Sequence, residues 1–560
     1  MIKTILSIAA TITLLLSSGS CKKKYLDETP QAIIAPDNLY VNKAGFDAGL
    51  YGLYNLVRSE RKGISGAAND ITSTAAIIGV DNAYSLSPAG GAAESVFNDF
   101  GVRLNSSATY ITNLWSYLYK VVNAANTIID RSENKSINWT DAQKNQIVAE
   151  ARLIRAWAYR HLTYLWGAVP LTLHESSGNN IRTDWERTPV AEVRATIEQD
   201  LLFAEANLAD LPVLEGRVSK VVASHYLAEL YLTIGDNQKA KDKALSVTQN
   251  AKYSLITARY GVKKTLLGTP FTDMFIDGNS NRNEGNTEVL WTFQNQYLSP
   301  GGDVNIMRRW WVNRYDQIKV GGKNPITYSK DNGGRGLARF GATKYAFSVY
   351  GPTDDRGSGS AWRFYWIMNN PASLPTGSQP IATCTTPGYT GGKLGDTVIL
   401  SINCNEPIPN ATTYPNWPNT RKWDYAPDDP ADVQQTSNYN DQIYLRLAET
   451  YLLLAEAQFK LGDLTGAAAT INVLRTRARA TIITPAQVTM DFILDERSRE
   501  LFSEEHRRYT LLRTGTWYAR TKQYNLYTGA LITLRDTILP IPQSVIDANL
   551  TKVFPQNPGY

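Results

Sequence analysis

One stretch, residues 441–480, constrains the fold of this chain more than any other. It reads DQIYLRLAETYLLLAEAQFKLGDLTGAAATINVLRTRARA. From residue 443 to 461 apolar and small residues recur at helical spacing on more than one face, which predicts a helix that is packed on several sides. Gly462 and Asp463 interrupt the pattern, because glycine favours the left-handed conformation that ends a helix and aspartate can cap the next one. The stretch therefore predicts a hairpin of two helices.

A second copy of this hairpin lies upstream at residues 225–240, HYLAELYLTIGDNQKA, with Gly235 and Asp236 at the turn. Large residues before a Gly-Asp turn and small residues after it are typical of tetratricopeptide-type repeats. One such unit cannot bury its own apolar face, so neighbouring helices must stack on it. We expect these neighbours at residues 113–130, 141–166 and 190–208, and a first helix with an apolar face at residues 42–59. The sequence therefore predicts a mainly α-helical protein.

The composition is that of an ordered globular protein, with 43% hydrophobic and 19% charged residues. A net charge of +5 is small for 560 residues. No long basic stretch with interleaved aromatic residues is present, so the sequence does not indicate a nucleic-acid partner.

The N-terminus has the pattern of an export signal. Lys3 is followed by an apolar run at residues 5–16 and by small residues at 17–20. The run is too short to span a membrane. Cys21 follows directly and resembles the lipidated cysteine of a bacterial lipobox, although Ser18 stands where leucine is usual. We expect a signal peptide at residues 1–20 and a lipid on Cys21; an ordinary secretory signal before a chance cysteine is the alternative.

The rest of the chain divides into four parts by composition. We expect a polar tether, a first helical region, a loop-rich lobe crowded with Gly, Pro, Asn and aromatic residues, and a second helical region that completes the same intertwined fold. Their bounds are 21–40, 41–256, 257–440 and 441–560. Short strands are expected in the lobe at residues 288–293, 344–349 and 397–402.

Five stretches, spread in order over almost the whole chain, carry a family resemblance. They are CKKKYLDETP at 21–30, AEARLIRAWAYRHLTYLWGAVPL at 149–171, GRVSKVVASHYLAELYLTIGD at 216–236, the hairpin at 441–480 with ILDERSRELFSEEHRRYTLLRTG at 493–515, and ILPIPQSVIDANL with the final NPGY. Each alone is unspecific, but the ordered set resembles the SusD/RagB family of Bacteroidetes outer-membrane lipoproteins.

The resemblance implies a SusD-like α-helical fold with four tetratricopeptide-like helix pairs. It also implies a lipid-anchored protein on the outside of the outer membrane, which acts as a hinged lid over a SusC-like TonB-dependent transporter. Such proteins capture a glycan, and sometimes a peptide, for import. We therefore expect a nutrient-binding protein. A peptide-binding RagB-type lid and a tetratricopeptide adaptor that binds only protein are the alternatives.

Aromatic residues of the loop-rich lobe are the predicted ligand contacts: Trp310, Trp311, Trp362, Tyr365 and Trp366. Sugar rings stack on flat aromatic faces, and binding pockets combine such faces with a few placed polar groups. These residues stand in loop-rich sequence with no evident core partner. The alternatives are that they pack the lobe or contact the transporter, because interfaces also favour Trp and Tyr.

The polar loop after the first helix is a second candidate, represented by Asp70 and Tyr84, because related proteins often use this loop for ligand. Cys384 and Cys404 are the remaining cysteines. In an exported protein two such cysteines are more often a disulfide than a metal or catalytic pair, so we expect them to be bonded.

The sequence offers little for catalysis or for a metal. The dense charges at residues 495–508 alternate carboxylates with arginines, which lower a carboxyl pKa and disfavour a general acid. Residues 277–288 match the oxygen spacing of an EF-hand loop, but Arg282 replaces its essential glycine, which favours a polar turn. The four histidines are scattered, and nucleotide or hydrolase motifs are lacking. We therefore expect no enzyme, metal or cofactor; a lipid-anchored glycan hydrolase has no motif in its support.

Overall fold

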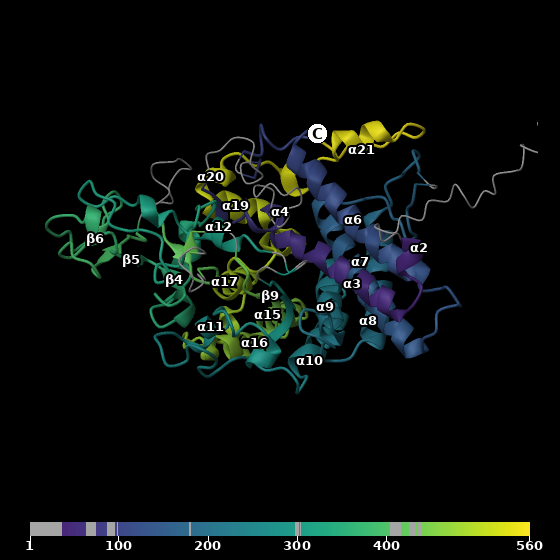
Figure 1. The fold of residues 1–560 in the computed structure, drawn as a ribbon, viewed down its shortest axis with the longest axis horizontal. Coiled ribbons are helices and arrows are strands. Elements are labelled where there is room, and N and C mark those ends of the chain that lie inside the picture. The colour runs from purple at the N-terminus through teal and green to yellow at the C-terminus, as the bar shows by residue number, and fades with distance from the viewer. Residues whose placement is uncertain are drawn as a thin grey trace, which may run out of the picture.

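The computed structural model of the chain describes residues 36–62, 74–86, 96–97, 99–178, 181–296, 299, 302, 304–403, 416–424, 433–434 and 438–560. The fold is mainly helical, and a loop-rich lobe projects from one end (Figure 1).

The first long helix confirms the apolar pattern of residues 42–59. It is α3 (Lys43–Arg58), which follows the short α2 (Pro36–Leu39) and continues into the 3₁₀ turn η2 (Ser59–Arg61). Asn42 caps α3 by accepting a hydrogen bond from the Gly45 amide at 3.0 Å. The apolar face of α3 is buried against α6 and α7, in front of which α3 crosses in Figure 1.

The core of the molecule is a stack of helices in which each packs against the next in chain order. They are α6 (Thr109–Arg131), α7 (Asp141–Trp166), α8 (Val190–Asn207), α9 (Lys220–Ile234), α10 (Asn237–Thr248), α15 (Leu447–Lys460) and α16 (Leu464–Arg477). The step from α10 to α15 joins the two halves of the sequence. The stack confirms the mainly helical fold class, whereas its division into four repeat pairs stays a prediction.

The two hairpin turns have the predicted geometry. Gly235 and Gly462 have positive φ values of 87° and 80°, which favour glycine. The side chain of Asp236 accepts a hydrogen bond from the Lys239 amide at 3.1 Å, and Asp463 accepts one from the Gly466 amide at 2.8 Å. Each turn therefore ends one helix and caps the next.

The start of the first helix in the hairpin at residues 441–480 was predicted wrongly. Its first residues form a strand, β9 (Gln442–Arg446), and the helix begins only at Leu447. β9 pairs antiparallel with β2 (Val289–Phe293), which confirms the strand expected at residues 288–293. Apolar residues in both strands are buried, so this pairing across the sequence overrides the local helical spacing.

The loop-rich lobe contains short strands, as predicted. They are β3 (Phe340–Ala342), which pairs with β1 (Ala83–Ser85) from the first part of the chain, β4 (Trp362–Arg363) with β8 (Asn419–Thr420), and a sheet of β5 (Tyr365–Ile367), β7 (Thr397–Ile399) and β6 (Gly388–Tyr389). Short helices α11 (Pro270–Asp273), α12 (Met307–Trp311) and α13 (Lys344–Ser348) lie between them.

The prediction of a strand at residues 344–349 was wrong, because α13 occupies this stretch. Two hydrogen bonds hold Thr343 in place. Its backbone amide donates to the Asn82 carbonyl at 3.0 Å, and its side-chain hydroxyl donates to the Asp81 carbonyl at 2.8 Å. The Ala346 amide then bonds back to the Thr343 carbonyl and starts a helical turn. These contacts come from a distant segment, which local alternation does not reveal.

The C-terminal region folds back on both halves. Its helices are α17 (Met490–Leu501), α18 (Arg507–Arg513), α19 (Trp517–Tyr524), α20 (Leu526–Gly529) and α21 (Gln543–Ala548). The Leu539 amide donates to the Leu165 carbonyl at 2.7 Å, and the Asn557 side chain donates to the Trp166 carbonyl at 3.1 Å. The end of the chain is thereby fixed to the end of α7.

The charge cluster on α17 is a buried ion-pair network, as expected. Glu496 and Glu500 are fully buried, and both bond to Arg356 of the lobe, at 2.8 and 2.9 Å. Glu500 also bonds to Arg446 at 2.5 Å and to Arg477. Although burial raises the pKa of the Glu500 carboxyl, the neighbouring arginines outweigh it and hold this pKa well below its ordinary value. These carboxylates stay ionised and serve structure.

The EF-hand-like stretch is also structural. The Glu288 side chain bonds to Arg446 at 2.9 Å and to Arg477 at 3.0 Å, so its oxygens belong to the same network.

No helix among the described residues is both long and apolar enough to cross a membrane.

Candidate functional site

Three of the predicted ligand contacts, Trp310, Trp311 and Trp362, are core residues. Their exposed fractions are 0%, 2% and 2%. Trp311 and Trp362 both pack on Phe502, with ring centroids 5.2 and 4.8 Å apart, and Trp310 packs on Phe340 at 4.6 Å. The premise that they lie on the surface was wrong, because the lobe and α17 meet and bury them together.

Trp366 and Tyr365 lie in the three-stranded sheet of the lobe. Trp366 is fully buried in a separate small core, where it stacks on Tyr315. The adjacent Tyr365 points to the other side of the strand and is partly exposed, as the period of two in a strand requires. Only Tyr365 of the five aromatic candidates therefore presents a ring to solvent.

The remaining predicted positions fall in three classes. Tyr84 is fully buried in β1, so it too is a core residue. Cys384 is disulfide-bonded, which agrees with the expected pairing, but its predicted partner Cys404 lies outside the described residues. Asp70 and Cys21 also lie outside them, and their roles stay predictions.

A cleft with a free volume of about 510 Å³ lies where three segments meet. One wall is the exposed side of α3, the second is the turn at residues 214–217, and the third is the end of β2 with Gln294. This size lies in the range of ordinary ligand pockets.

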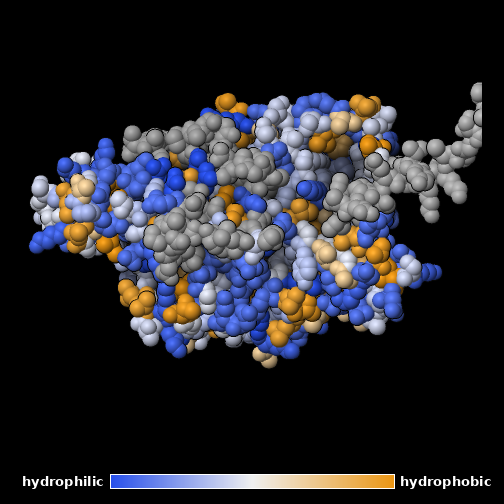
Figure 2. All heavy atoms as spheres, viewed as in Figure 1, coloured by the Kyte–Doolittle hydropathy of each residue, from blue (hydrophilic) through white to orange (hydrophobic). Residues whose placement is uncertain are grey.

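The rim of the cleft combines apolar faces with polar groups. Tyr51 and Leu214 are large residues with exposed fractions of 54% and 52%. Asn55, Glu215 and Gln294 add two amides and a carboxylate to the lining. On the face shown in Figure 2, hydrophobic residues form small separate patches among hydrophilic ones. The cleft is thus suited to a polar ligand with one flat apolar face.

Close backbone contact shapes the cleft at Gly216. This residue has a φ of 83°, and a Cβ atom here would lie 2.4 Å from the Gln294 Cγ atom. The Trp291 indole donates to the Gly216 carbonyl at 2.9 Å, and Arg58 donates to the carbonyl of Gln294. These bonds hold the turn, β2 and α3 against one another, so the walls are preorganised.

A buried ion pair supports the floor. Arg217 donates two hydrogen bonds of 2.7 Å to Glu150 of α7, and the Tyr54 hydroxyl donates to the same carboxylate at 2.6 Å. Tyr54 in turn accepts from the Val218 amide at 3.0 Å. Burial raises the pKa of the Tyr54 hydroxyl well above its ordinary value, so it remains a donor. The floor is therefore fixed to α7.

Sequence reasoning missed this cleft because its walls come from distant segments. One signal was available: Tyr51 lies on α3 outside the stripe of buried residues Phe46, Leu50, Leu53 and Val57. An aromatic residue outside the apolar stripe has no core partner and is a candidate for binding.

Comparisons with known proteins place the chain in a family. The model described as the SusD family matches residues 271–560, and one described as "Starch-binding associating with outer membrane" matches residues 24–232. SusD-like protein P25 of Formosa agariphila is 26% identical over 577 residues, which cover 99% of each chain.

Solved structures agree in fold. A SusD homolog from Bacteroides thetaiotaomicron has a TM-score of 0.69 and 18% identity, with 94% of this chain and 98% of that chain covered. A structure titled "Laminarin binding SusD-like protein" has a TM-score of 0.63 and 21% identity, with 93% and 100% covered. Given the family match over more than half its length, the chain belongs to the SusD family.

Proposed function

We propose that this protein is a surface-exposed outer-membrane lipoprotein that captures an oligosaccharide in the cleft beside α3 and delivers it to a SusC-like TonB-dependent transporter. The observation that carries the proposal is the cleft itself, with Tyr51 exposed at its rim and amide and carboxylate groups around it. Support for the anchor comes from Cys21 after the export signal. The family descriptions, which name starch binding and the outer membrane, support the ligand class and the location.

The chemistry of the cleft fits a sugar. A pyranose ring offers one apolar face, which can stack on Tyr51, and hydroxyls that can bond to Asn55, Glu215 and Gln294. Tyrosine loses little side-chain entropy on binding because it has only two rotatable torsions. The preorganised walls around Gly216 reduce the entropic cost of binding further.

The proposal is for binding without turnover. Hydrolysis of a glycoside requires two carboxyl groups that flank the bond, one of them with a raised pKa. In α17 the buried Glu496 and Glu500 are bonded to arginines, which lower the pKa values of both carboxyls. Glu215 is the one carboxylate in the lining of the cleft.

Glycan binding tests the proposal directly. Residues 22–560, which lack the anchor, would be screened on a glycan array, and the affinity for each hit measured by calorimetry. We expect Tyr51→Ala to weaken binding about tenfold, close to the 1–2 kcal/mol typical of an anchoring aromatic. The melting temperature should stay within about 1 °C because an exposed surface ring contributes little to stability.

Tyr518→Ala is the control, since Tyr518 lies on α19 and does not line the cleft. Equal loss in both variants, or full affinity in Tyr51→Ala, would place the ligand elsewhere. Binding of peptides with no glycan bound would instead support the peptide-binding lid. Capture of the transporter with neither ligand bound would support the protein-binding adaptor.

A further inference from the structure

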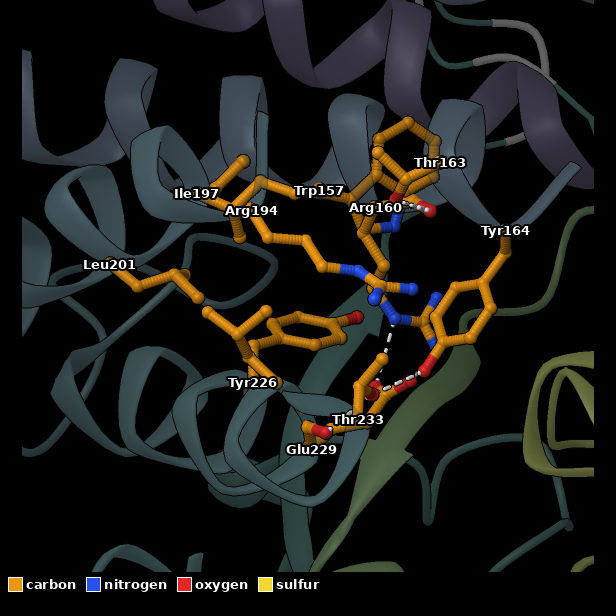
Figure 3. A pocket seen from close by; sticks show the side chains of 12 residues that line it. Trp157, Arg160, Thr163, Tyr164, Arg194, Ile197, Leu201, Tyr226, Glu229 and Thr233 are labelled. Atoms are coloured by element: carbon orange, nitrogen blue, oxygen red, sulfur yellow. Dashed lines mark hydrogen bonds and ion pairs between the residues drawn. The ribbon is translucent and has the colours of Figure 1, made fainter. Parts of the chain in front are cut away.

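A second, narrow pocket lies inside the helical stack, where α7, α8 and α9 meet (Figure 3). Its free volume is about 20 Å³, against about 510 Å³ for the cleft. A space of this size has room for a small chemical group and not for a sugar ring. The apolar walls include Trp157, Ile197 and Leu201.

Two arginines extend into this pocket, and only one of them has a counterion. Arg160 of α7 donates to both carboxylate oxygens of Glu229, at 2.8 and 2.9 Å, and contacts His506 Nδ1 at 3.0 Å. Arg194 of α8 points toward Arg160 in Figure 3. Within the described part of the chain Arg194 makes no hydrogen bond or ion pair. The pocket therefore carries one excess positive charge.

The positive charge of Arg194 is energetically unfavourable in this pocket. Its side chain is partly buried, and burial lowers the pKa of its guanidinium. An arginine side chain nevertheless stays protonated in proteins, so a desolvated positive charge remains. Arg160 is nearby with the same sign, and its carboxylate partner is already used. An anion next to Arg194 would offset both unfavourable effects.

A hydroxyl donor lies beside this guanidinium. The Tyr226 hydroxyl points into the same space in Figure 3, and among the described residues it has no hydrogen-bond partner. Burial raises its pKa far above the ordinary value, which keeps it protonated. The hydroxyls of Tyr164 and Thr233 are engaged with each other at 2.7 Å. Arg194 and Tyr226 are thus two donors without acceptors.

We propose that this pocket binds one carboxylate group, held by the Arg194 guanidinium and the Tyr226 hydroxyl. A planar guanidinium matches the two oxygens of a carboxylate, and charge-assisted hydrogen bonds of this kind are the strong ones. The Arg160–Glu229 pair forms a fixed wall that sets the size limit of the group. The site is separate from the cleft and does not depend on the glycan proposal.

The test compares acetate with its neutral analogue acetamide, using residues 22–560. Melting temperatures would be measured by calorimetry while sodium acetate replaces sodium chloride at constant ionic strength, and again with acetamide at the same concentrations. We expect a saturable rise with acetate and none with acetamide, because a ligand that binds the folded state stabilises it.

Three variants locate the effect. Arg194→Gln should weaken the acetate response at least tenfold, and Tyr226→Phe should weaken it severalfold. Lys264→Gln, which removes an equal charge from an exposed loop, should leave it unchanged. In acetate-free buffer Arg194→Gln should melt no lower than the wild type, which shows that it folds.

Two results would overturn the proposal. Equal responses to acetate and acetamide would show that the charge of the group does not matter. An acetate response retained in Arg194→Gln would show that the anion binds elsewhere. Glycan affinity at the cleft should not change in any of these variants, so the two proposals fail separately.

Discussion

Replacing Glu500 by glutamine tests whether the buried charges of α17 hold the loop-rich lobe against the C-terminal helical region. Glu500 is fully buried and accepts from arginines of three separate segments: Arg356 of the lobe, Arg446 at the end of β9, and Arg477 of α16. Glutamine has nearly the same shape but no charge. The three arginines would keep their positions and lose one shared counterion.

The ion-pair network around Glu500 has no excess of carboxylates that could replace its charge. Its cations are Arg356, Arg446, Arg475, Arg477, Arg499 and Lys422, and its carboxylates are Asp354, Glu288, Glu496, Glu500 and Glu504. Among the described residues, six cations thus face five carboxylates, so the loss of the Glu500 charge leaves guanidinium charge uncompensated. Breaking a buried pair in this way costs about 3–5 kcal/mol.

The expected shift in melting temperature follows from chain length. An unfolding entropy of about 2.1 cal/mol/K per residue gives about 1.2 kcal/mol/K for a chain of this size. The variant should therefore melt about 2.5–4 °C lower at pH 7. Calorimetry at neutral pH measures this, with Glu186→Gln as control because the Glu186–Lys552 pair is largely exposed. A Glu500→Gln variant that melts within 1 °C of the wild type would refute the reasoning.

The pH dependence gives a second check. The pKa of Glu500 in the folded state lies well below its ordinary value, so its contribution to stability is fully present above the unfolded pKa of about 4.3. It is lost as the pH falls from there toward the folded pKa. The gap between wild type and variant should therefore be constant from pH 6 to 8 and should narrow below about pH 4.5. A gap that widens in acid would contradict the assignment.

Three further predictions concern single residues. Cys21→Ala should release the protein from membranes or leave the precursor uncleaved; normal processing and unchanged outer-membrane fractionation would count against the lipid anchor. Labelling of thiols in denatured, unreduced mature protein should find none at Cys384 or Cys404, and the bond should stabilise by about 3 kcal/mol. Trp362→Ala should lower the unfolding free energy by about 3–5 kcal/mol, because this ring packs between Phe347 and Phe502. Denaturant titration checks this, and an unchanged unfolding midpoint would indicate that Trp362 lies on the surface.

Local sequence signals predicted the helical part of the fold well. The Gly-Asp turns at Gly235 and Gly462 and the apolar stripe of α3 act within a few residues, so they can be read from the sequence. The strand β9 could not be recognised in this way. Its partner β2 lies far upstream, and the pairing with it decides the conformation of residues that also fit a helix.

The candidate site was predicted poorly, for a related reason. A tryptophan in Gly- and Asn-rich sequence has no local partner, so Trp311 and Trp362 looked exposed, yet both meet Phe502 of a distant segment. Conversely, Tyr51 was overlooked although it stands outside the apolar stripe of its own helix. Burial in a lobe of this kind is set by contacts between segments, which composition does not show.

The packing of α10 against α15 has a consequence for how the chain folds as it is made. Helices α6 to α10 can form from local contacts as soon as they emerge, but the surface that α10 presents to α15 stays uncovered until the whole lobe has followed. Contacts between segments so distant in sequence are slow to form. During this interval the first half of the chain exposes an apolar face that favours association with other chains. We therefore expect the isolated first half to aggregate, and a separately supplied second half that contains α15 to rescue it by covering the same face.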